Sequence, residues 1–492
     1  MCSRRGLALA GLSGLWFIGS SFAATRYVNV YNSAPVSPYT NYWSGAATNI
    51  QQAIDVAASG DEILVAPGVY RIATRIEIPQ NKTLTLRSTE SRAAIIDAQR
   101  LCAALHVDGI NSVVEGFTLR NGTNASYGGG VSLVRAGTVR DCLVTGNQAW
   151  GGGGIVLRDS NALVENCTVQ SNLATYLGGG IVILNAATGQ VKNCIIRGNV
   201  ASNFDGGVSL QGAGIVSNCW IADNRAVLND AGGVNLFGGG RLVNSVVTGN
   251  RAGRDAGGVR SSAGAVVHCT VVSNAAGRDS GGLYTHYLST SVNCIVYFNT
   301  ALTNPDLYPH WESNVIRNCC TPTNVNLDAS NFTNAPTFVN FAARDFRPTA
   351  GSACVDAGAA APGVSIDYAG NPRPVPGVLG GAAKYDVGAF EYQLPVEVCD
   401  GIDNDGDAQV DEDCRSSSSY FSGNQSVRCT GAGWSRTFAM DLTNFRNIAV
   451  QDGYQSYTVN YALFYNIWTG IYLFDYDAGA FTALTWLTNL DL

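Results

Sequence analysis

The dipeptide Asn-Cys recurs through the middle of this chain at a nearly constant interval. From Cys142 to Cys319 the slot that holds the cysteine returns every 24 to 27 residues. The full pairs are Asn166-Cys167, Asn193-Cys194, Asn218-Cys219, Asn293-Cys294 and Asn318-Cys319, and the other slots hold Asp141-Cys142, Asn244-Ser245 and His268-Cys269. A period kept over so many units indicates a repeat architecture, in which each unit contacts only its neighbours.

Two further columns keep the same period. Another asparagine follows five residues after each slot, and a Gly-Gly pair followed by an aliphatic residue comes later in each unit. The trailing asparagines are Asn147, Asn172, Asn199, Asn224, Asn250, Asn274 and Asn299. Within one unit, residues 179–183 alternate as a strand does, and further short strands lie on either side of Asn193. We therefore expect three short strands per unit, separated by bends.

Stacking such units places equivalent residues about 4.8 Å apart, which is the spacing of paired strands. Asparagine suits the bend because it tolerates left-handed backbone angles, and its amide can bond the asparagine above and below. Cysteine there behaves as a small apolar residue that points into a narrow core. The sequence thus predicts an inward cysteine column and an asparagine ladder beside it.

These columns resemble the repeats of bacterial secreted proteins with a right-handed parallel β-helix of the pectin-lyase-like superfamily. The resemblance covers residues 45–392 and implies an all-β solenoid. It says little about chemistry, because the superfamily includes lyases, hydrolases, adhesins and phage spikes. The net charge of −7 and the pI of about 5.2 provide no basic surface for a nucleic acid.

The first residues have the features of a secretory signal peptide. Arg4 and Arg5 precede an apolar run over residues 7–18, and residues 21–23 supply a small-x-small cleavage site. We expect residues 1–23 to be removed and residues 24–44 to form an N-terminal extension. The mature chain should be secreted or held at the cell surface without a transmembrane segment.

Each end of the solenoid has a recognisable segment. Residues 48–51 have the pattern of a capping box, with Thr48 as the N-cap of a short amphipathic helix that ends before Gly60. Such a helix would cover the open first coil. Residues 343–392 resemble the choice-of-anchor Q module of bacterial surface proteins, which implies a C-terminal closure of the helix.

Residues 393–430 form a linker that contains an aspartate-rich loop at 399–414. Carboxylates at alternate positions suit a hard cation with six to eight oxygen ligands, so we expect Ca²⁺. The loop resembles the aspartate-rich metal-binding motif of secreted bacterial proteins and the calcium loops of thrombospondin type 3 repeats. Its candidate ligands are Asp403, Asp405, Asp407, Gln409, Asp411 and Glu412. The alternative is a solvated acidic linker closed by a disulfide.

Export permits disulfides, and we expect one between Cys399 and Cys414. The seven cysteines of the repeat column should instead be free, buried thiols. The pairing of four others stays open: Cys102, Cys320, Cys354 and Cys429. Residues 431–492 are rich in aromatic residues with strand-like alternation, which predicts a small antiparallel β tail.

A column of aspartates before the Gly-Gly pairs is the weak catalytic candidate: Asp205, Asp230, Asp255 and Asp279. Neighbouring coils would hold these carboxylates roughly 5 Å apart, which is near the separation in a retaining glycosidase. Nearby arginines could neutralise them, and a turn ladder of alternating charges is the favoured alternative. The catalytic motifs of polygalacturonases and pectate lyases are missing.

Histidines and exposed aromatic residues are the remaining candidates. His268 occupies a slot of the ladder and should be structural, while His286 and His310 have no evident partner in the sequence. Four aromatic residues on or beside turns could stack on sugar rings or fill the turns: Trp150, Tyr176, Tyr284 and Tyr287.

Together these features predict a secreted or surface-associated β-helix protein that binds an extended polysaccharide or cell-surface glycan without catalysis. The alternative is a polysaccharide lyase or glycoside hydrolase that uses the face from Asp205 to Asp279.

Overall fold

The structure is a computed structural model. It describes residues 23–394 except 41, 159–160, 185–187, 312, 323–327, 362 and 379–380, and beyond them only the backbone of six strands. The chain divides into two compact units, the first comprising Met1–Gly377 and Ala382–Tyr392 and the second comprising Val378–Gly381 and Gln393–Leu492. The signal-peptide prediction, apart from its last residue, and the Asp-rich loop both lie outside the described residues.

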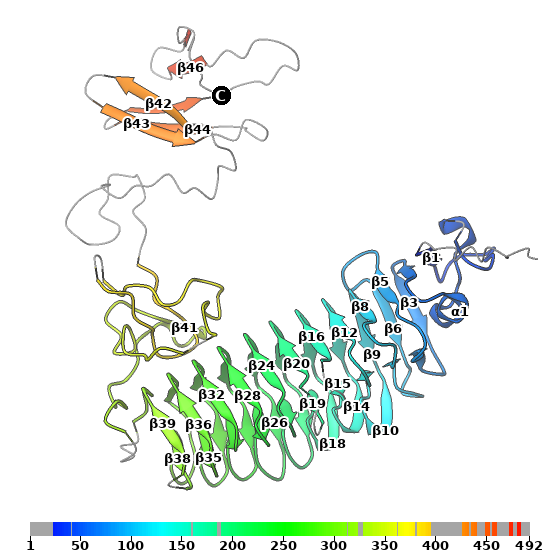
Figure 1. Cartoon of the computed structure of the whole chain (residues 1–492), viewed down its shortest axis with the longest axis horizontal. Helices are drawn as coiled ribbons and strands as arrows, with labels where there is room; N and C mark the ends of the chain where they lie inside the picture. Colours follow the sequence, from blue (N-terminus) through cyan, green and yellow to red (C-terminus); the bar gives the residue numbers. More distant parts are fainter. Residues whose placement is uncertain are drawn as a thin grey trace, which may run out of the picture. The chain divides into compact units, whose positions relative to one another are not determined.

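The first unit contains a parallel β-helix built from four sheets (Figure 1). Sheet A has 12 strands: β1 (Thr25–Val28), β2 (Glu62–Val65), β5 (Thr85–Ser88), β8 (Val113–Glu115), β12 (Thr138–Arg140), β16 (Leu163–Glu165), β20 (Gln190–Lys192), β24 (Ile215–Ser217), β28 (Arg241–Val243), β32 (Ala265–Val267), β36 (Thr290–Val292) and β39 (Val315–Arg317).

Sheet B follows sheet A in each coil and has 10 strands: β3 (Gly68–Arg71), β6 (Ala94–Asp97), β9 (Phe117–Arg120), β13 (Leu143–Thr145), β17 (Thr168–Gln170), β21 (Ile195–Arg197), β25 (Trp220–Ala222), β29 (Val246–Thr248), β33 (Thr270–Val272) and β37 (Ile295–Tyr297). Sheet C also has 10: β4 (Ile76–Ile78), β7 (Leu105–Val107), β11 (Val131–Leu133), β15 (Ile155–Leu157), β19 (Ile181–Ile183), β23 (Val208–Leu210), β27 (Val234–Phe237), β31 (Val259–Ser262), β35 (Leu283–His286) and β38 (Leu307–Pro309).

The prediction of three strands per unit is incomplete, because the middle coils carry a fourth. Sheet D lies between sheets B and C in chain order and has 7 short strands: β10 (Thr123–Tyr127), β14 (Gln148–Gly151), β18 (Leu173–Leu177), β22 (Val200–Ala201), β26 (Arg225–Ala226), β30 (Arg251–Ala252) and β34 (Ala275–Ala276). The glycines that follow it pass close under the next coil. A Cβ on Gly206, for example, would stand 2.4 Å from the backbone of Arg225.

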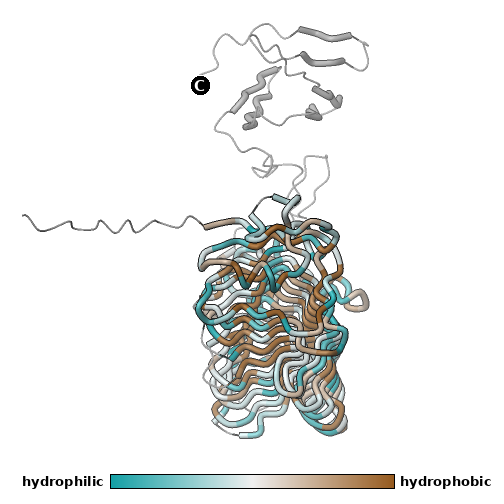
Figure 2. The backbone as a smooth tube through the Cα atoms, turned by 90° about the vertical axis from the view of Figure 1, so that its right-hand side faces the viewer, coloured by the Kyte–Doolittle hydropathy of each residue, from teal (hydrophilic) through white to brown (hydrophobic). Residues whose placement is uncertain are grey.

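The predicted cysteine column is confirmed. All seven repeat cysteines are at most 1 % exposed, they are free thiols, and they join one continuous core with the inward aliphatic residues. Burial raises the pKa of the Cys294 thiol well above its usual range. Figure 2 shows the hydrophobic segments of successive coils stacked over one another.

The amide ladder exists, but it lies mainly in the other asparagine column. Asn199 donates from its side-chain Nδ2 to Asn224 Oδ1 at 2.9 Å, and its backbone N–H donates to the same oxygen at 3.0 Å. The pattern repeats from Asn147 to Asn299. Among the bend residues that the structure describes, only two pairs make such contacts: Asn244 donates to Asn218 Oδ1, and Asn293 Nδ2 contacts His268 Nε2, both at 2.9 Å. The bend residues are instead united by left-handed backbone angles, with φ between 49° and 56°.

A short helix, α1 (Ile50–Val56), follows the 3-10 turn η1 (Trp43–Gly45) and lies at the N-terminal end of the solenoid (Figure 1). Its N-cap is Asn49 and not the predicted Thr48, because the Asn49 side chain accepts a 2.7 Å bond from the Gln51 N–H. Ile50 and Ile54 are buried in the same core as the coils.

After the last coil the chain folds back along the solenoid. Residues 338–377 and 382–392, here called the docked segment, begin with an antiparallel pair, β40 (Phe338–Asn340) and β41 (Asp345–Pro348). Phe346 stacks on Trp220 of β25 at 5.9 Å between ring centroids, and Asn293 exchanges two hydrogen bonds with Ala359 at 2.7 and 2.8 Å. The implied closure of the end is therefore a lateral contact over several coils.

Paired strands continue into the second unit. β42 (Ser426–Gly431) pairs with β43 (Trp434–Ala439), and β44 (Ile448–Asp452), β45 (Gln455–Val459), β46 (Tyr472–Asp475) and β47 (Ala480–Ala483) form a four-stranded sheet. All of these pairings are antiparallel. Among the residues the structure describes, no helix is long and apolar enough to cross a membrane.

Candidate functional site

From β23 to β38, the outward face of sheet C carries one polar or aromatic side chain per coil, whereas the two coils before hold Val156 and Val182 in the same register. Register aligns Ser209, Asn235, Arg260, Tyr284 and Tyr308 on consecutive strands from β23 to β38. A buried aliphatic residue precedes each of them, and the residue that follows is also buried in the first four: Leu210, Leu236, Ser261 and Thr285. Strand alternation therefore directs this column away from the core. This column could have been found in the sequence, because each of its first four residues directly follows a Gly-Gly-aliphatic triplet.

A second outward column ends in a cluster of rings. His286, at the end of β35, stacks on His310 with ring centroids 5.1 Å apart and 17° between the planes. Trp311 meets both imidazoles edge-on and is 49 % exposed. The expectation that these histidines lack partners is therefore wrong. Partial burial, Arg260 and His310 all lower the pKa of His286, which favours its neutral form at neutral pH.

Three of the four candidate aspartates share one register beside this face. Asp255 and Asp279 form a parallel bridge, and the N–H that follows Asp230 donates to the Asp255 carbonyl at 3.0 Å. Asp205 stands one residue later in its coil, directly before its Gly-Gly pair, whereas Phe204 holds the position that corresponds to Asp230. The predicted four-carboxylate column thus contains three in-register carboxylates.

Two of these carboxylates are bound by arginines. Asp230 accepts from Arg254 Nε and Nη2, both at 2.9 Å, and Asp255 accepts from Arg278 Nε at 2.7 Å and from its Nη2. Asp279 accepts a 3.1 Å bond from the Asn304 side chain. This is the alternating-charge arrangement that the sequence offered as the alternative to catalysis.

Asp205 is as deeply buried as Asp230 and Asp255, but it differs from them because its Oδ1 has no hydrogen-bond partner among the described residues. Burial raises the pKa of its carboxyl to about 6, against the opposing influence of Ser209 and Asn235. A carboxyl held near this value can exchange a proton at mildly acidic pH. It lies beneath the surface, however, so a substrate could not reach it without a local opening.

The aromatic residues of sheet D pack against each other. Trp150 and Tyr176 stack with centroids 4.7 Å apart and planes at 12°, and Tyr127 and Phe204 meet the two ends of this pair edge-on. The faces that a sugar would need are largely occupied, so this cluster fills the turns. Tyr287, by contrast, is 54 % exposed.

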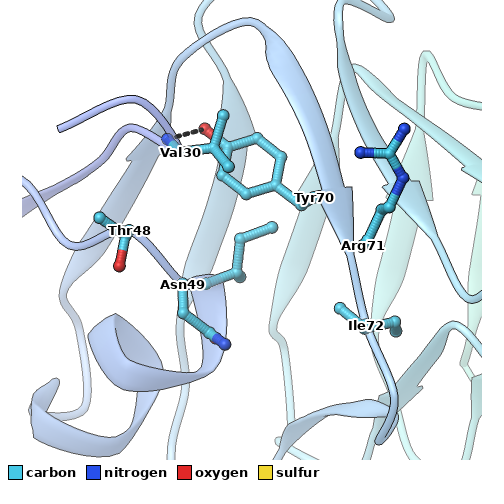
Figure 3. Close-up of a pocket in the computed structure, with 7 residues that line it drawn as sticks. Val30, Thr48, Asn49, Tyr70, Arg71 and Ile72 are labelled. Atoms are coloured by element: carbon cyan, nitrogen blue, oxygen red, sulfur yellow. Dashed lines mark hydrogen bonds between the residues drawn. The ribbon is translucent and has the colours of Figure 1, made fainter.

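A small pocket lies between the start of α1 and β3 (Figure 3). Its volume is about 50 Å³, and it is lined by Val30, Thr48, Asn49, Ile50, Tyr70, Arg71 and Ile72. Tyr70 both donates to the Ala66 carbonyl at 2.9 Å and accepts from the Val30 N–H at 3.4 Å. Ligand pockets usually span about 300–1,000 Å³, so this one suits a water molecule at most.

The expected calcium ligands from Asp403 to Glu412 and the disulfide between Cys399 and Cys414 lie outside the described residues. Within residues 23–394, apart from the gaps given above, no three metal-ligating side chains gather at one point. The calcium site stays a prediction from the sequence.

Comparison with known proteins bears on the fold. The family described as right handed beta helix region matches residues 103–301. The solenoid is a right-handed β-helix.

The crystal structure of pectate lyase Pel9A superposes with a TM-score of 0.51 at 16 % identity, covering 76 % of this chain and 98 % of the lyase. Two other similar structures have lower scores. Rhamnogalacturonan lyase gives 0.41 at 13 % identity over 63 % and 91 % of the two chains, and the PL6 family lyase Pedsa3628 from Pseudopedobacter saltans gives 0.27 at 13 % over 57 % and 86 %. No curated protein matches the chain. At these identities the likeness concerns the fold.

Proposed function

We propose that this is an exported β-helix protein that binds an extended polysaccharide along the outward face of sheet C. The observation that carries the proposal is the in-register column of Asn235, Arg260, Tyr284 and Tyr308, one side chain per coil. A polymer of repeating units is matched by a surface that repeats at intervals of about 4.8 Å. Aromatic rings pack on the apolar faces of sugars, and guanidinium and amide groups bond their hydroxyl or carboxylate oxygens.

Two outside observations support this choice. The structural likeness to pectate lyase Pel9A shows that this fold accommodates a polysaccharide-active protein. The resemblance of residues 343–392 to a choice-of-anchor module and the predicted signal peptide favour a place at the cell surface.

Binding without turnover is the favoured form of the proposal. Asp230 and Asp255 each accept two hydrogen bonds from one guanidinium, which leaves neither free to take a proton from a substrate. One observation favours the enzymatic alternative, namely the pKa of about 6 at Asp205, which is in the range of a general acid.

The deciding experiment exposes the purified full chain to a panel of acidic and neutral polysaccharides and measures both affinity and product formation. Tyr284→Ala and Tyr308→Ala should each weaken binding by about 2- to 12-fold, which corresponds to the ~0.5–1.5 kcal/mol of an aromatic contact. Tyr287→Ala is the matched control, because Tyr287 is an exposed tyrosine outside the column. Unchanged affinity in both column variants would refute the site.

The same panel separates binding from catalysis. We expect the parent chain to form no product from any polysaccharide. Three variants should therefore differ from it neither in product formation nor, appreciably, in affinity: Asp205→Asn, Asp255→Asn and Asp279→Asn. Product that appears with the parent chain and disappears with these variants would establish the enzyme instead.

We also propose that the loop at 399–414 binds Ca²⁺. Calcium should raise the melting temperature of the full chain, because a ligand that binds only the folded state stabilises it. Asp405→Asn should reduce that shift, whereas Asp345→Asn, outside the loop, should not. If calcium does not change the melting temperature, the loop is better interpreted as a solvated acidic linker.

A further inference from the structure

We propose that Cys320 and Cys354 form a disulfide that fastens the docked segment to the last coil of the solenoid. The structure holds both as free thiols, and the sequence alone left their pairing open. The proposal concerns how the molecule is held together and does not depend on its ligand.

Cys320 belongs to a different column from its neighbour Cys319. Cys319 continues the inward thiol column, whereas Cys320 forms a parallel bridge with Ile295 and so extends the outward column of sheet B. Its N–H donates to the Cys294 carbonyl at 2.9 Å, and its carbonyl accepts from the Val296 N–H at 2.8 Å. The backbone at Cys320 is therefore fixed by the coil beneath it.

Cys354 approaches from the docked segment and is equally well held. Its carbonyl accepts a 2.9 Å bond from the Val387 N–H, and its own N–H lies 3.5 Å from the Ser352 hydroxyl. Both cysteines are fully buried, and both belong to one apolar cluster that contains Ile295 and Phe346. The two side chains thus meet at the interface between segments that are remote in topology.

The electrostatics of the two thiols are linked as well. A hydrogen bond with the Cys354 thiol is the largest cause that raises the pKa of Cys320, ahead of burial. The Cys320 Sγ lies 3.2 Å from the Asn334 carbonyl as well. A disulfide requires the two Cα atoms to lie about 4.4–6.8 Å apart, and two cysteines held by fixed backbones in one buried cluster are suitable candidates for that geometry.

Access to an oxidant distinguishes this pair from the inward thiols. Cys294 and Cys319 are also neighbours, but they are enclosed as soon as their coils stack, and each Sγ lies 3.3 Å from a carbonyl of its own coil. Cys320 faces outward, where Phe332, Asn334 and the docked segment cover it, so it stays open until these later parts of the chain fold back. Oxidation can therefore occur at the moment of docking, before the interface closes.

The reaction is a thiol–disulfide exchange with a small-molecule disulfide such as oxidised glutathione. One protein thiolate attacks a sulfur of the oxidant and releases one glutathione thiol, and the second protein thiolate then displaces the other. The S–S bond of glutathione breaks and that of the protein forms. Two electrons and two protons pass from the cysteines to the two glutathione molecules.

The test is to refold the reduced full chain with oxidised and reduced glutathione, block the remaining thiols, and map the cross-linked tryptic peptides by mass spectrometry. The proposal expects the peptide that contains Cys320 to be joined to the one that contains Cys354. Cleavage after Arg344 separates the two cysteines, so the cross-link is visible.

A matched pair of variants assigns the sulfur, because Cys319 and Cys320 share one peptide. Cys319→Ser should keep the cross-link, since the equivalent slot already holds Ser245 in the native column. Cys320→Ser should abolish it. Reduction should lower the melting temperature of the Cys319→Ser variant by a few degrees more than that of Cys320→Ser, because the expected disulfide between Cys399 and Cys414 is common to both. A parent chain with both cysteines blocked, or with either joined to another cysteine, would overturn the proposal even if a variant failed to fold.

Discussion

One residue in each coil turns the chain from sheet A to sheet B with left-handed backbone angles. Asparagine holds most of these positions because its short amide tolerates that conformation. On the early coils the residue is exposed, as at Asn166, whereas Asn244, His268 and Asn293 are buried beneath the docked segment. There His268 contacts the Asn293 amide at 2.9 Å, and burial lowers its pKa to about 3, so it serves as a neutral packing group.

The buried amide ladder should matter more to stability than the bend asparagines. Asn224→Leu removes the acceptor of two bonds from Asn199 and the donor of bonds to Asn250 and the Ile196 carbonyl. We expect a loss of about 3–5 kcal/mol, because several buried groups lose their partners. Asn218→Leu should cost about 1–2 kcal/mol, since its side chain accepts one part-buried bond and leucine tolerates the left-handed angles of this position less well than asparagine. Urea unfolding measures both, and equal losses would contradict the assignment.

The buried Asp205 carboxyl predicts a specific pH dependence. Its pKa is raised from 3.8 to about 6 in the folded state, so the folded state binds the proton more tightly than the unfolded chain. Its favourable contribution is complete below about pH 4, declines as pH rises, and is lost above about pH 6, for a total of roughly 3 kcal/mol.

Asp205→Asn should therefore raise stability at about pH 7.5 and have little effect at about pH 4. The comparison with the parent chain isolates this residue, because Glu391 and Asp386 also have raised pKa values, of about 7 and about 6, that act in the same direction. Glu391→Gln is a control, and it is introduced into both the parent chain and the Asp205→Asn variant. The difference in stability between these two chains should be the same with and without Glu391→Gln. A difference that does not vary with pH would refute the assignment.

Periodicity predicted some of these residues and misplaced others. The cysteine column could be placed inward because a narrow core accepts a small apolar side chain in every coil. Two asparagine columns share one period, however, and spacing alone cannot say which amide points inward. The one-residue offset of Asp205 from the other aspartates was not predicted for a related reason. A shift of one residue hardly alters the repeat length, but it changes which side chains surround the carboxylate.

At the scale of elements, one outer face of the solenoid is a binding surface for the chain itself. From β25 onward the outward residues of sheet B become Trp220, Val246, Val272 and Ile295, and these pack under the docked segment. The sequence carries this change as apolar runs in place of alternation, as at Val246-Val247. Its partner could not be predicted, because the docked segment lies far along the chain and shares no period with the coils.

Trp220→Ala should loosen the docked segment selectively. Trp220 contacts the rings of Phe346 and Tyr368, both at 5.9 Å between centroids. We expect a loss of about 2–3 kcal/mol in the stability of this contact, by analogy with other large-to-small changes. Hydrogen exchange should quicken in residues 338–392. Trp150→Ala is the control, since Trp150 packs within sheet D, and equal effects of the two variants on the docked segment would argue against the interface.

At the scale of the whole molecule, stability is a sum over coils and their contacts. Each strand pairs only with the strands one coil before and one coil after, as β16 does with β12 and β20. The molecule should therefore tolerate the loss of one complete coil, provided every column stays in phase.

Deletion of residues 148–172 tests this, because it joins Asn147 to Leu173 and replaces one ladder asparagine by its equivalent. The shortened chain should keep its β-type circular dichroism and a cooperative melt within a few degrees of the parent. Deletion of residues 148–158 removes only part of a coil and should abolish the cooperative melt. Similar behaviour of the two deletions would contradict a solenoid built from independent repeats.

The asparagine ladder has a direction as well as a length. Every Oδ1 from Asn172 to Asn299 accepts from the preceding coil, and the last amide donates to the carboxylate of Asp306 at 2.9 Å. The amide dipoles are therefore aligned, with their positive ends toward the later coils. An anion stabilises the positive end of such a series, as it does at the N-terminus of a helix. Asp306 thus acts as the counter-charge at the end of a polarised row of amides. Because such a row has the same partial charge at its end whatever its length, a molecule with more coils would need the same single acidic residue.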